Sequence, residues 1–192
     1  MAIYTSEYLR TISRKGTLNE SIKNFSAKDK TRSTFDIFLS HSFLDKEEVE
    51  GLYLELSNTG FSVYVDWIID PHLDRSNVTK ESANLVRTRM QSSRSLLLGI
   101  SENAAVSKWM PWELGYVDGH TKACAIIPVT KKQTSPNSYR AVEYLSLYPF
   151  ISKKSDNQGK DRLWVIEEAD SYIVIEDWII GKKPFKRNVK IF

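Results

Sequence analysis

Two side chains in the segment Ser101–Gly119 have types and a spacing that suit chemistry on a cationic, planar group. Trp109 and Glu113 are four residues apart, so on a helix they lie on the same face. The face of an indole ring attracts a cation, and a carboxylate beside it meets the positive charge. The pair is therefore a candidate site for binding, and acting on, a positively charged aromatic ring.

The nicotinamide ring of NAD is such a group. Nicotinamide leaves as a neutral molecule, so cleavage of its bond to ribose needs no general acid. The reaction needs stabilisation of an oxocarbenium-like ribosyl centre and orientation of the ribose hydroxyls, which one carboxylate in a dry pocket supplies. The same spacing also fits a core aromatic residue at Trp109 and a surface acid at Glu113, and spacing alone leaves both interpretations open.

The composition is that of one globular domain with or without appendages. The chain has 192 residues, of which 41% are hydrophobic and 27% charged, and this excludes wholesale disorder and a fibrous protein. Its longest apolar runs, 96–100 and 123–129, are too short to span a bilayer, and no apolar signal segment opens the chain. Cys124 is the only cysteine, which excludes an internal disulfide. We therefore expect a cytoplasmic protein with no membrane partner.

The positive charge is concentrated in an N-terminal arm, residues 1–34. The arm holds seven Lys and Arg against three Asp and Glu, a net charge of +4, and the rest of the chain carries −1. A nucleic-acid reader needs a basic stripe on its folded part, so no nucleic-acid partner is expected. Within the arm we predict a short helix over 6–13 and a Lys-rich linker over 26–34. The arm is then either a solvated extension or a docking helix.

Several classes of site are absent from the sequence. It contains no GxGxxG, GxxxxGK(S/T) or GxSxG motif. Its three histidines have no metal-ligand spacing: His41, His72 and His120. We expect no metal and no cofactor.

Short buried strands alternate with helical segments through the middle of the chain. Strands are predicted at 35–40, 61–65, 96–100, 124–129 and 149–151. Helices are predicted after an N-cap at Asp45, over 78–92, over 101–117 and within 139–148, and a loop over 67–77. This alternation predicts an α/β fold with a flavodoxin-like, doubly wound, parallel five-stranded sheet. A ligand then binds at the carboxyl ends of the strands, which carry Ser40 to Ser42, Asp66 and Trp67, Ser101 and Glu102, and Thr130.

A C-terminal extension, residues 152–192, follows the central domain, residues 35–151. Two further strands are predicted in it, over 163–167 and 172–176, giving a small β extension that packs on the domain. We expect Trp164 and Trp178 to pack this tail onto the sheet.

Three blocks of the sequence resemble TIR domains, especially bacterial ones. FDIFLSHS, followed by Asp45, is similar to the family's first conserved box, and FSVYVD at 61–66 is similar to its second strand, which ends in an acid. SENAAVSKWMPWELG at 101–115 is similar to its third helix, with a serine, a tryptophan, and a glutamate four residues later. The blocks follow one another at the family's distances, and the resemblance covers about residues 35–151.

The resemblance implies an NAD glycohydrolase or cyclase, with NAD as the substrate. Glu113 matches the family's catalytic glutamate, and Trp109 matches a tryptophan that stacks on the substrate in some members. The loops after the first and second strands line the nucleotide pocket in the family, and the matching residues here are His41, Ser42, Phe43, Asp66 and Trp67.

Two features depart from the family's pattern. The loop 67–77 lacks the usual glycine and the Arg-Asp-x-x-Pro-Gly pattern of animal receptor adaptors. Pro111 lies between Trp109 and Glu113, and proline is tolerated only in the first turn of a helix. We therefore predict that the helix begins near Trp109, after an irregular lead-in over 103–108.

A stand-alone chain of this type resembles the signal-producing component of bacterial anti-phage systems such as Thoeris. That resemblance implies conversion of NAD into a cyclic ADP-ribose isomer or an ADP-ribose conjugate, which activates a separate effector protein. The alternative is a non-catalytic TIR adaptor that acts by association between TIR domains. A nucleoside deoxyribosyltransferase of similar topology is a third interpretation.

Overall fold

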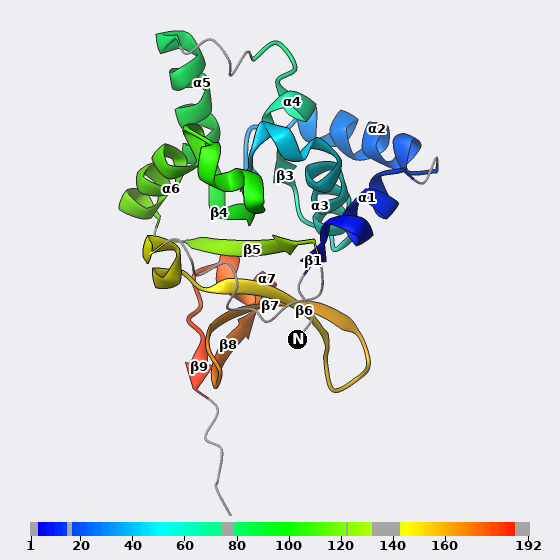
Figure 1. The fold of residues 1–192 in the computed structure, drawn as a ribbon, viewed down its shortest axis with the longest axis vertical. Coiled ribbons are helices and arrows are strands. Elements are labelled where there is room, and N and C mark those ends of the chain that lie inside the picture. Colours follow the sequence, from blue (N-terminus) through cyan, green and yellow to red (C-terminus); the bar gives the residue numbers. More distant parts are fainter. Residues whose placement is uncertain (1–3, 15–16, 74–78, 122, 132–142, 187–192) are drawn as a thin grey trace, which may run out of the picture.

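One sheet runs through the whole computed structural model, which describes residues 4–14, 17–73, 79–121, 123–131 and 143–186 (Figure 1). The strand order is β3-β2-β4-β5-β6-β7-β8-β9, and β1 pairs with β5 beside this path. The strands are β1 (Tyr4–Thr5), β2 (Phe35–Ser40), β3 (Val63–Tyr64), β4 (Ser93–Ile100), β5 (Cys124–Thr130), β6 (Phe150–Ser155), β7 (Asp161–Glu168), β8 (Ser171–Val174) and β9 (Phe185–Lys186). Neighbours from β3 to β6 are parallel, which confirms the flavodoxin-like sheet.

Helices cover both faces of the parallel part. They are α1 (Ser6–Arg14), α2 (Thr17–Lys30), α3 (Lys46–Asn58), α4 (Asp66–Ile69), α5 (Lys80–Gln91), α6 (Trp109–His120) and α7 (Ile175–Ile179), with short 3-10 helices η1 (Phe43–Asp45), η2 (Glu102–Val106) and η4 (Glu143–Leu147). In Figure 1, α1 and α3 lie on one side of β3 and β4, and α5 and α6 lie on the other. Covering on both faces explains why the continuous apolar runs 96–98 and 125–127 are at most 1% exposed.

Two predicted elements around β3 have different bounds in the structure. The strand predicted at 61–65 is only Val63–Tyr64. Before it, Ser62 binds the Asp36 carboxylate with its backbone N–H and its hydroxyl, and after it, Val65 is already the N-cap of α4. The predicted loop 67–77 begins instead with the short helix α4, and residues 74–78 lie outside the described part of the chain. The second part of the helix predicted within 139–148 is the 3-10 helix η4. Residues 139–142 lie outside the described part of the chain.

The predicted linker over 26–34 is wrong, since α2 extends through Lys30. Its lysines line the exposed face, whereas Ser26 and Asp29 on the other face are 8% and 4% exposed. The Asp29 carboxylate accepts hydrogen bonds from Tyr53 of α3 at 3.0 Å and from Arg32 at 2.9 Å. A polar, Lys-rich segment is thus a docked helix with one buried face.

The N-terminal arm is also joined to the domain through its first residues. β1 runs parallel to the end of β5, with Tyr4 opposite Val129. Helix α1 packs closely on α3 at Gly51. A Cβ atom added to Gly51 would lie 2.4 Å from the carbonyl oxygen of Leu9, so only glycine, which has no Cβ, avoids a clash at this position. Of the two interpretations of the arm, the docking helix is confirmed.

The C-terminal extension continues the sheet with antiparallel strands. β7 pairs with β6 and β8 pairs with β7, close to the predicted strands. Helix α7 follows β8 and buries Ile175, Trp178 and Ile179, so Trp178 packs the tail as predicted. Trp164 stays half-buried and contacts Tyr172 edge-on, with ring centroids 5.6 Å apart. Within the described residues, no helix is long and apolar enough to cross a membrane.

Candidate functional site

Glu113 lies inside the molecule at the carboxyl end of the parallel sheet. It has no exposed surface, and its Oε2 atom accepts a hydrogen bond of 2.6 Å from the hydroxyl of Ser40, the last residue of β2. The interpretation of Glu113 as a surface acid is therefore wrong. A buried carboxylate held by a hydrogen bond is a preorganised negative charge, and it acts more strongly in this environment than it would in water.

The residue at which α6 begins determines where on the helix the Glu113 carboxylate lies. As predicted from Pro111, the helix begins at Trp109, and an irregular segment containing η2 leads into it. Pro111 then occupies the first turn, where no backbone donor is lost from the helix ladder. Glu113 is one turn further on, and Leu114 and Val117 of the same helix pack into the core.

Trp109 is half-buried at the first position of α6, one turn before Glu113. Its ring meets that of Trp112 edge-on, with centroids 5.4 Å apart. It packs against the core without being enclosed by it. The core interpretation of Trp109 therefore holds in part, and some of the ring remains accessible.

His41, Asp66 and Trp67 form a cluster where β2 and β3 end. The Nδ1 atom of His41 lies 2.9 Å from the carbonyl oxygen of Leu39, which can only accept, so Nδ1 carries a proton. The Nε2 atom accepts a 3.2 Å hydrogen bond from the indole N–H of Trp67 and lies 3.4 Å from Oδ1 of Asp66. The loops after the two strands are thus joined by one imidazole ring.

Ser42 and Phe43 stand apart from that cluster. Ser42 is 3% exposed, and its hydroxyl accepts the backbone N–H of Leu44 at 3.4 Å as the cap of η1. The ring of Phe43 is 72% exposed. The structure therefore gives Ser42 a local role and leaves the Phe43 ring open to a ligand or to another protein.

Ser40 and Asp45 have side-chain partners that the sequence did not predict, although Ser40 was expected at the carboxyl edge of the sheet and Asp45 was considered as a residue that orients the pocket. Ser40 is recognisable only as the last residue of a strand, and its partner is 73 positions away. Asp45 occupies the N-cap position of α3 as predicted, but its side chain makes no cap hydrogen bond to that helix. Its carboxylate accepts hydrogen bonds from Ser101 and Asn103 instead.

Metal binding and thiol chemistry have little support in the structure, and Cys124 is at the start of β5, away from the carboxyl edge. Among the described residues, no three His, Cys, Asp or Glu side chains are grouped as they would be around a metal ion. Burial raises the pKa of Cys124 to about 12, so at neutral pH the thiol stays protonated and is a poor nucleophile.

The order of the strands and the buried glutamate at the carboxyl edge of the sheet agree with one family of proteins. The chain matches the TIR domain family over residues 37–164, and it belongs to that family. It is 45% identical over 166 residues to "Probable 3' cyclic ADP-D-ribose synthase ThsB'" of Bacillus cereus (strain MSX-D12), covering 86% of this chain and 83% of that protein.

Two more distant similarities accompany this one. The chain is 26% identical over 86 residues to "Putative cyclic ADP-D-ribose synthase TIR2" of Cytobacillus dafuensis, covering 44% of this chain and 23% of that protein. Among solved structures, it is similar to the TIR domain of the Toll-related receptor TRR-2 of Hydra magnipapillata. That similarity has a TM-score of 0.40 and 17% identity, and covers 57% of this chain and 81% of the receptor domain.

Proposed function

We propose that this chain is an NAD-cleaving TIR enzyme of bacterial anti-phage defence, with Glu113 as its catalytic residue. It breaks the bond between nicotinamide and ribose and makes a cyclic ADP-ribose isomer or an ADP-ribose conjugate. The observation that carries the proposal is the buried Glu113 carboxylate, held by Ser40 at the carboxyl edge of a parallel sheet. The printed name of the 45% identical relative, a cyclic ADP-ribose synthase, supports the reaction.

The chemistry follows from the charge of the site. As the glycosidic bond breaks, its electron pair leaves with neutral nicotinamide, and positive charge develops on the ribosyl carbon. The Glu113 carboxylate stabilises that charge most effectively because it is buried and already oriented by Ser40. A nucleophile then bonds to the ribosyl carbon and loses a proton. For a cyclic product, the nucleophile is another atom of the same ADP-ribose.

Substrate binding involves the other residues of the same edge. Trp109 stacks on the nicotinamide ring, since part of its indole is accessible one turn from Glu113. In this proposal Asp66, Trp67 and Ser42, which follow strands β2 and β3, contact the bound nucleotide. His41 contributes by holding Trp67. Phe43 offers an exposed ring for stacking at the mouth.

The product passes the signal to a separate effector protein in the cytoplasm. A diffusible nucleotide needs no direct contact between the two proteins. Because constitutive cleavage would deplete cellular NAD, we expect low basal activity that self-association of TIR domains raises by completing the pocket.

The test is chromatography of NAD incubated with the purified chain, at low and high protein concentration and with lysate of infected cells. Glu113→Gln should reduce NAD loss by about 100-fold or more, because an amide supplies no negative charge to the ribosyl centre. The matched control is Glu168→Gln, since Glu168 is an exposed acid that pairs with Lys186 in the C-terminal extension, and its turnover should equal that of the parent.

Two results would contradict the proposal. Unchanged turnover in Glu113→Gln would remove the catalytic role of this residue. No NAD loss from a folded parent protein in any of the conditions would favour the adaptor alternative.

A further inference from the structure

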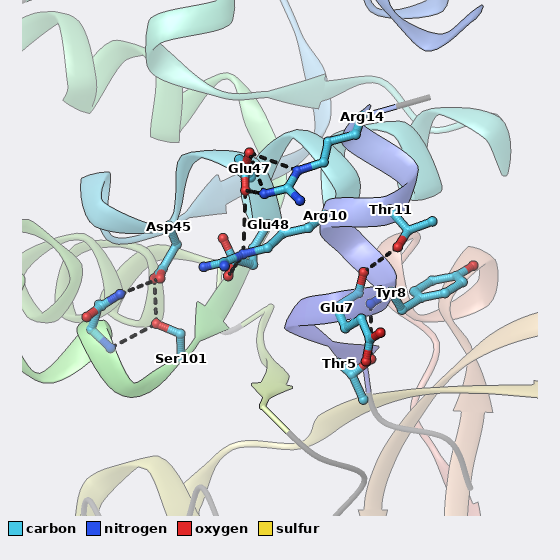
Figure 2. Close-up of polar contacts among 11 residues, drawn as sticks. Thr5, Glu7, Tyr8, Arg10, Thr11, Arg14, Asp45, Glu47, Glu48 and Ser101 are labelled. Atoms are coloured by element: carbon cyan, nitrogen blue, oxygen red, sulfur yellow. Dashed lines mark hydrogen bonds and ion pairs between the residues drawn. The ribbon is translucent and has the colours of Figure 1, made fainter. Parts of the chain in front are cut away.

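The loops that follow β2 and β4 are joined by one buried carboxylate. Asp45, at the end of η1, is 5% exposed. Its Oδ2 atom accepts a hydrogen bond from the Ser101 hydroxyl, and its Oδ1 atom accepts one of 2.7 Å from the side-chain amide of Asn103. The Ser101 hydroxyl also accepts the backbone N–H of Asn103 at 2.9 Å. Figure 2 shows Asp45 facing Ser101 across the gap between the two loops.

This connection lies beside the buried glutamate. β2 and β4 are neighbours in the sheet, with Ser40 opposite Leu98, and Ser40 holds Glu113. The two loops that leave these strands therefore flank the edge where the Ser40–Glu113 pair lies. The second loop continues through η2 into Trp109 at the start of α6. By fixing one loop against the other, Asp45 sets the spacing of the walls around the carboxylate.

The first turn of α3, directly after Asp45, has its own support. Arg10 of α1 reaches Glu48 with its Nε atom 2.8 Å from Oε1, and Glu48 is 4% exposed (Figure 2). Arg14 pairs with Glu47 through its guanidinium. Asp45 is therefore attached to a helix end that also contacts α1, and most of that support comes from the buried Glu48.

We infer that Asp45 is a positioning residue of the proposed NAD reaction, which keeps water from competing with the internal nucleophile. The inference rests on the proposed function. Cyclisation requires the cleaved ADP-ribose to stay folded in a closed pocket, whereas water captures the ribosyl centre when the walls separate. Loss of the Asp45 connection should therefore shift the product from the cyclic to the linear form more than it slows cleavage.

The experiment compares Asp45→Asn with Asp29→Asn. Asp29 is a matched control because it is a buried carboxylate that also accepts from two side chains, Tyr53 and Arg32, but it joins α2 to α3. Asp45→Asn places an amide against the amide of Asn103. The loss of a charged hydrogen bond then corresponds to a rise of about tenfold in the ratio of linear to cyclic product, with a higher KM for NAD. Asp29→Asn should lower Tm without changing that ratio.

A rescue separates positioning from general stability. The double variant Asp45→Asn, Asn103→Asp exchanges acceptor and donor, so an amide at position 45 again faces a carboxylate at position 103. It should restore the product ratio of the parent. Hydrogen exchange of the amides of 101–108 should be faster in Asp45→Asn and return in the double variant.

The outcomes distinguish this inference from the function it rests on. An active parent whose Asp45→Asn variant keeps the parental product ratio, or shifts it no more than Asp29→Asn does, would overturn the positioning role alone. A folded parent that consumes no NAD would overturn the proposed function, and this inference with it.

Discussion

The N-terminal arm and the C-terminal extension are attached to the same sheet by different interactions. The extension adds backbone ladders: β7 has six paired positions with β6 and four with β8. Among its described residues, the arm pairs only Tyr4 and Thr5 with β5. It is held mainly by side chains, of which Leu9 is fully buried and Tyr8 donates to Glu55. Attachment by backbone hydrogen bonds between strands tolerates the replacement of most side chains. Attachment by side-chain contacts depends on the few residues that make them.

The largest expected effect on stability comes from removal of residues 1–34. Tyr4 and Leu9 are 5% and 0% exposed, and burial of two such side chains contributes about 3 to 6 kcal/mol to the free energy of unfolding. We therefore expect the truncated chain to lose about that much and to expose the face of α3. Urea unfolding followed by circular dichroism measures it. A free energy of unfolding equal to that of the parent would show that the arm is dispensable.

A smaller effect tests the extension. Trp178→Ala should reduce the free energy of unfolding by about 3 to 5 kcal/mol, because the indole is 8% exposed beneath the sheet extension. Trp164→Ala is the paired variant: this ring is half-buried and donates one hydrogen bond to the carbonyl of Lys154, so its loss should cost about 1 kcal/mol. Equal losses in the two variants, measured by thermal unfolding, would mean that α7 does not anchor the extension.

The smallest expected effect on stability comes from adding one methyl group where α1 packs against α3. Gly51→Ala should destabilise the protein by about 1 to 3 kcal/mol, because the new methyl group meets the backbone of Leu9. Gly115→Ala in α6 has open space around it and should stabilise by about 0.5 to 1 kcal/mol. Calorimetry of both variants gives the sign of each change. If Gly51→Ala is also stabilising, α1 is not seated on α3 as described.

The central sheet was predictable because its signal is local. Strands such as Phe35–Ser40 are short, continuous apolar runs between turn signals, and their alternation with helices leaves few topologies. The lead-in to α6 was predictable for the same reason, since Pro111 restricts its own turn. The Lys-rich α2 was missed because its buried face consists of residues such as Ser26 and Asp29, which carry no apolar period.

The site was predictable only as a set of residue types at strand ends. Glu113 and Trp109 were assigned from their spacing and from the family resemblance, but the burial of Glu113 depends on Ser40, which is far away in the sequence. Asp45 has the sequence signature of a helix cap, yet Ser101 and Asn103 compete successfully for its carboxylate. Contacts of this kind between loops produce no periodic pattern in the sequence, so they could not be predicted from it.

In the part of the chain that the structure describes, both outer strands of the sheet are two residues long, β3 at one edge and β9 at the other. A free edge is a template on which another chain can add a strand, and very short edge strands remove most of its hydrogen-bonding groups. Lys186 at the β9 edge adds a charge that opposes such addition. Within the described residues the sheet therefore offers little edge for strand addition, and we expect copies of this chain to associate through helices and loops.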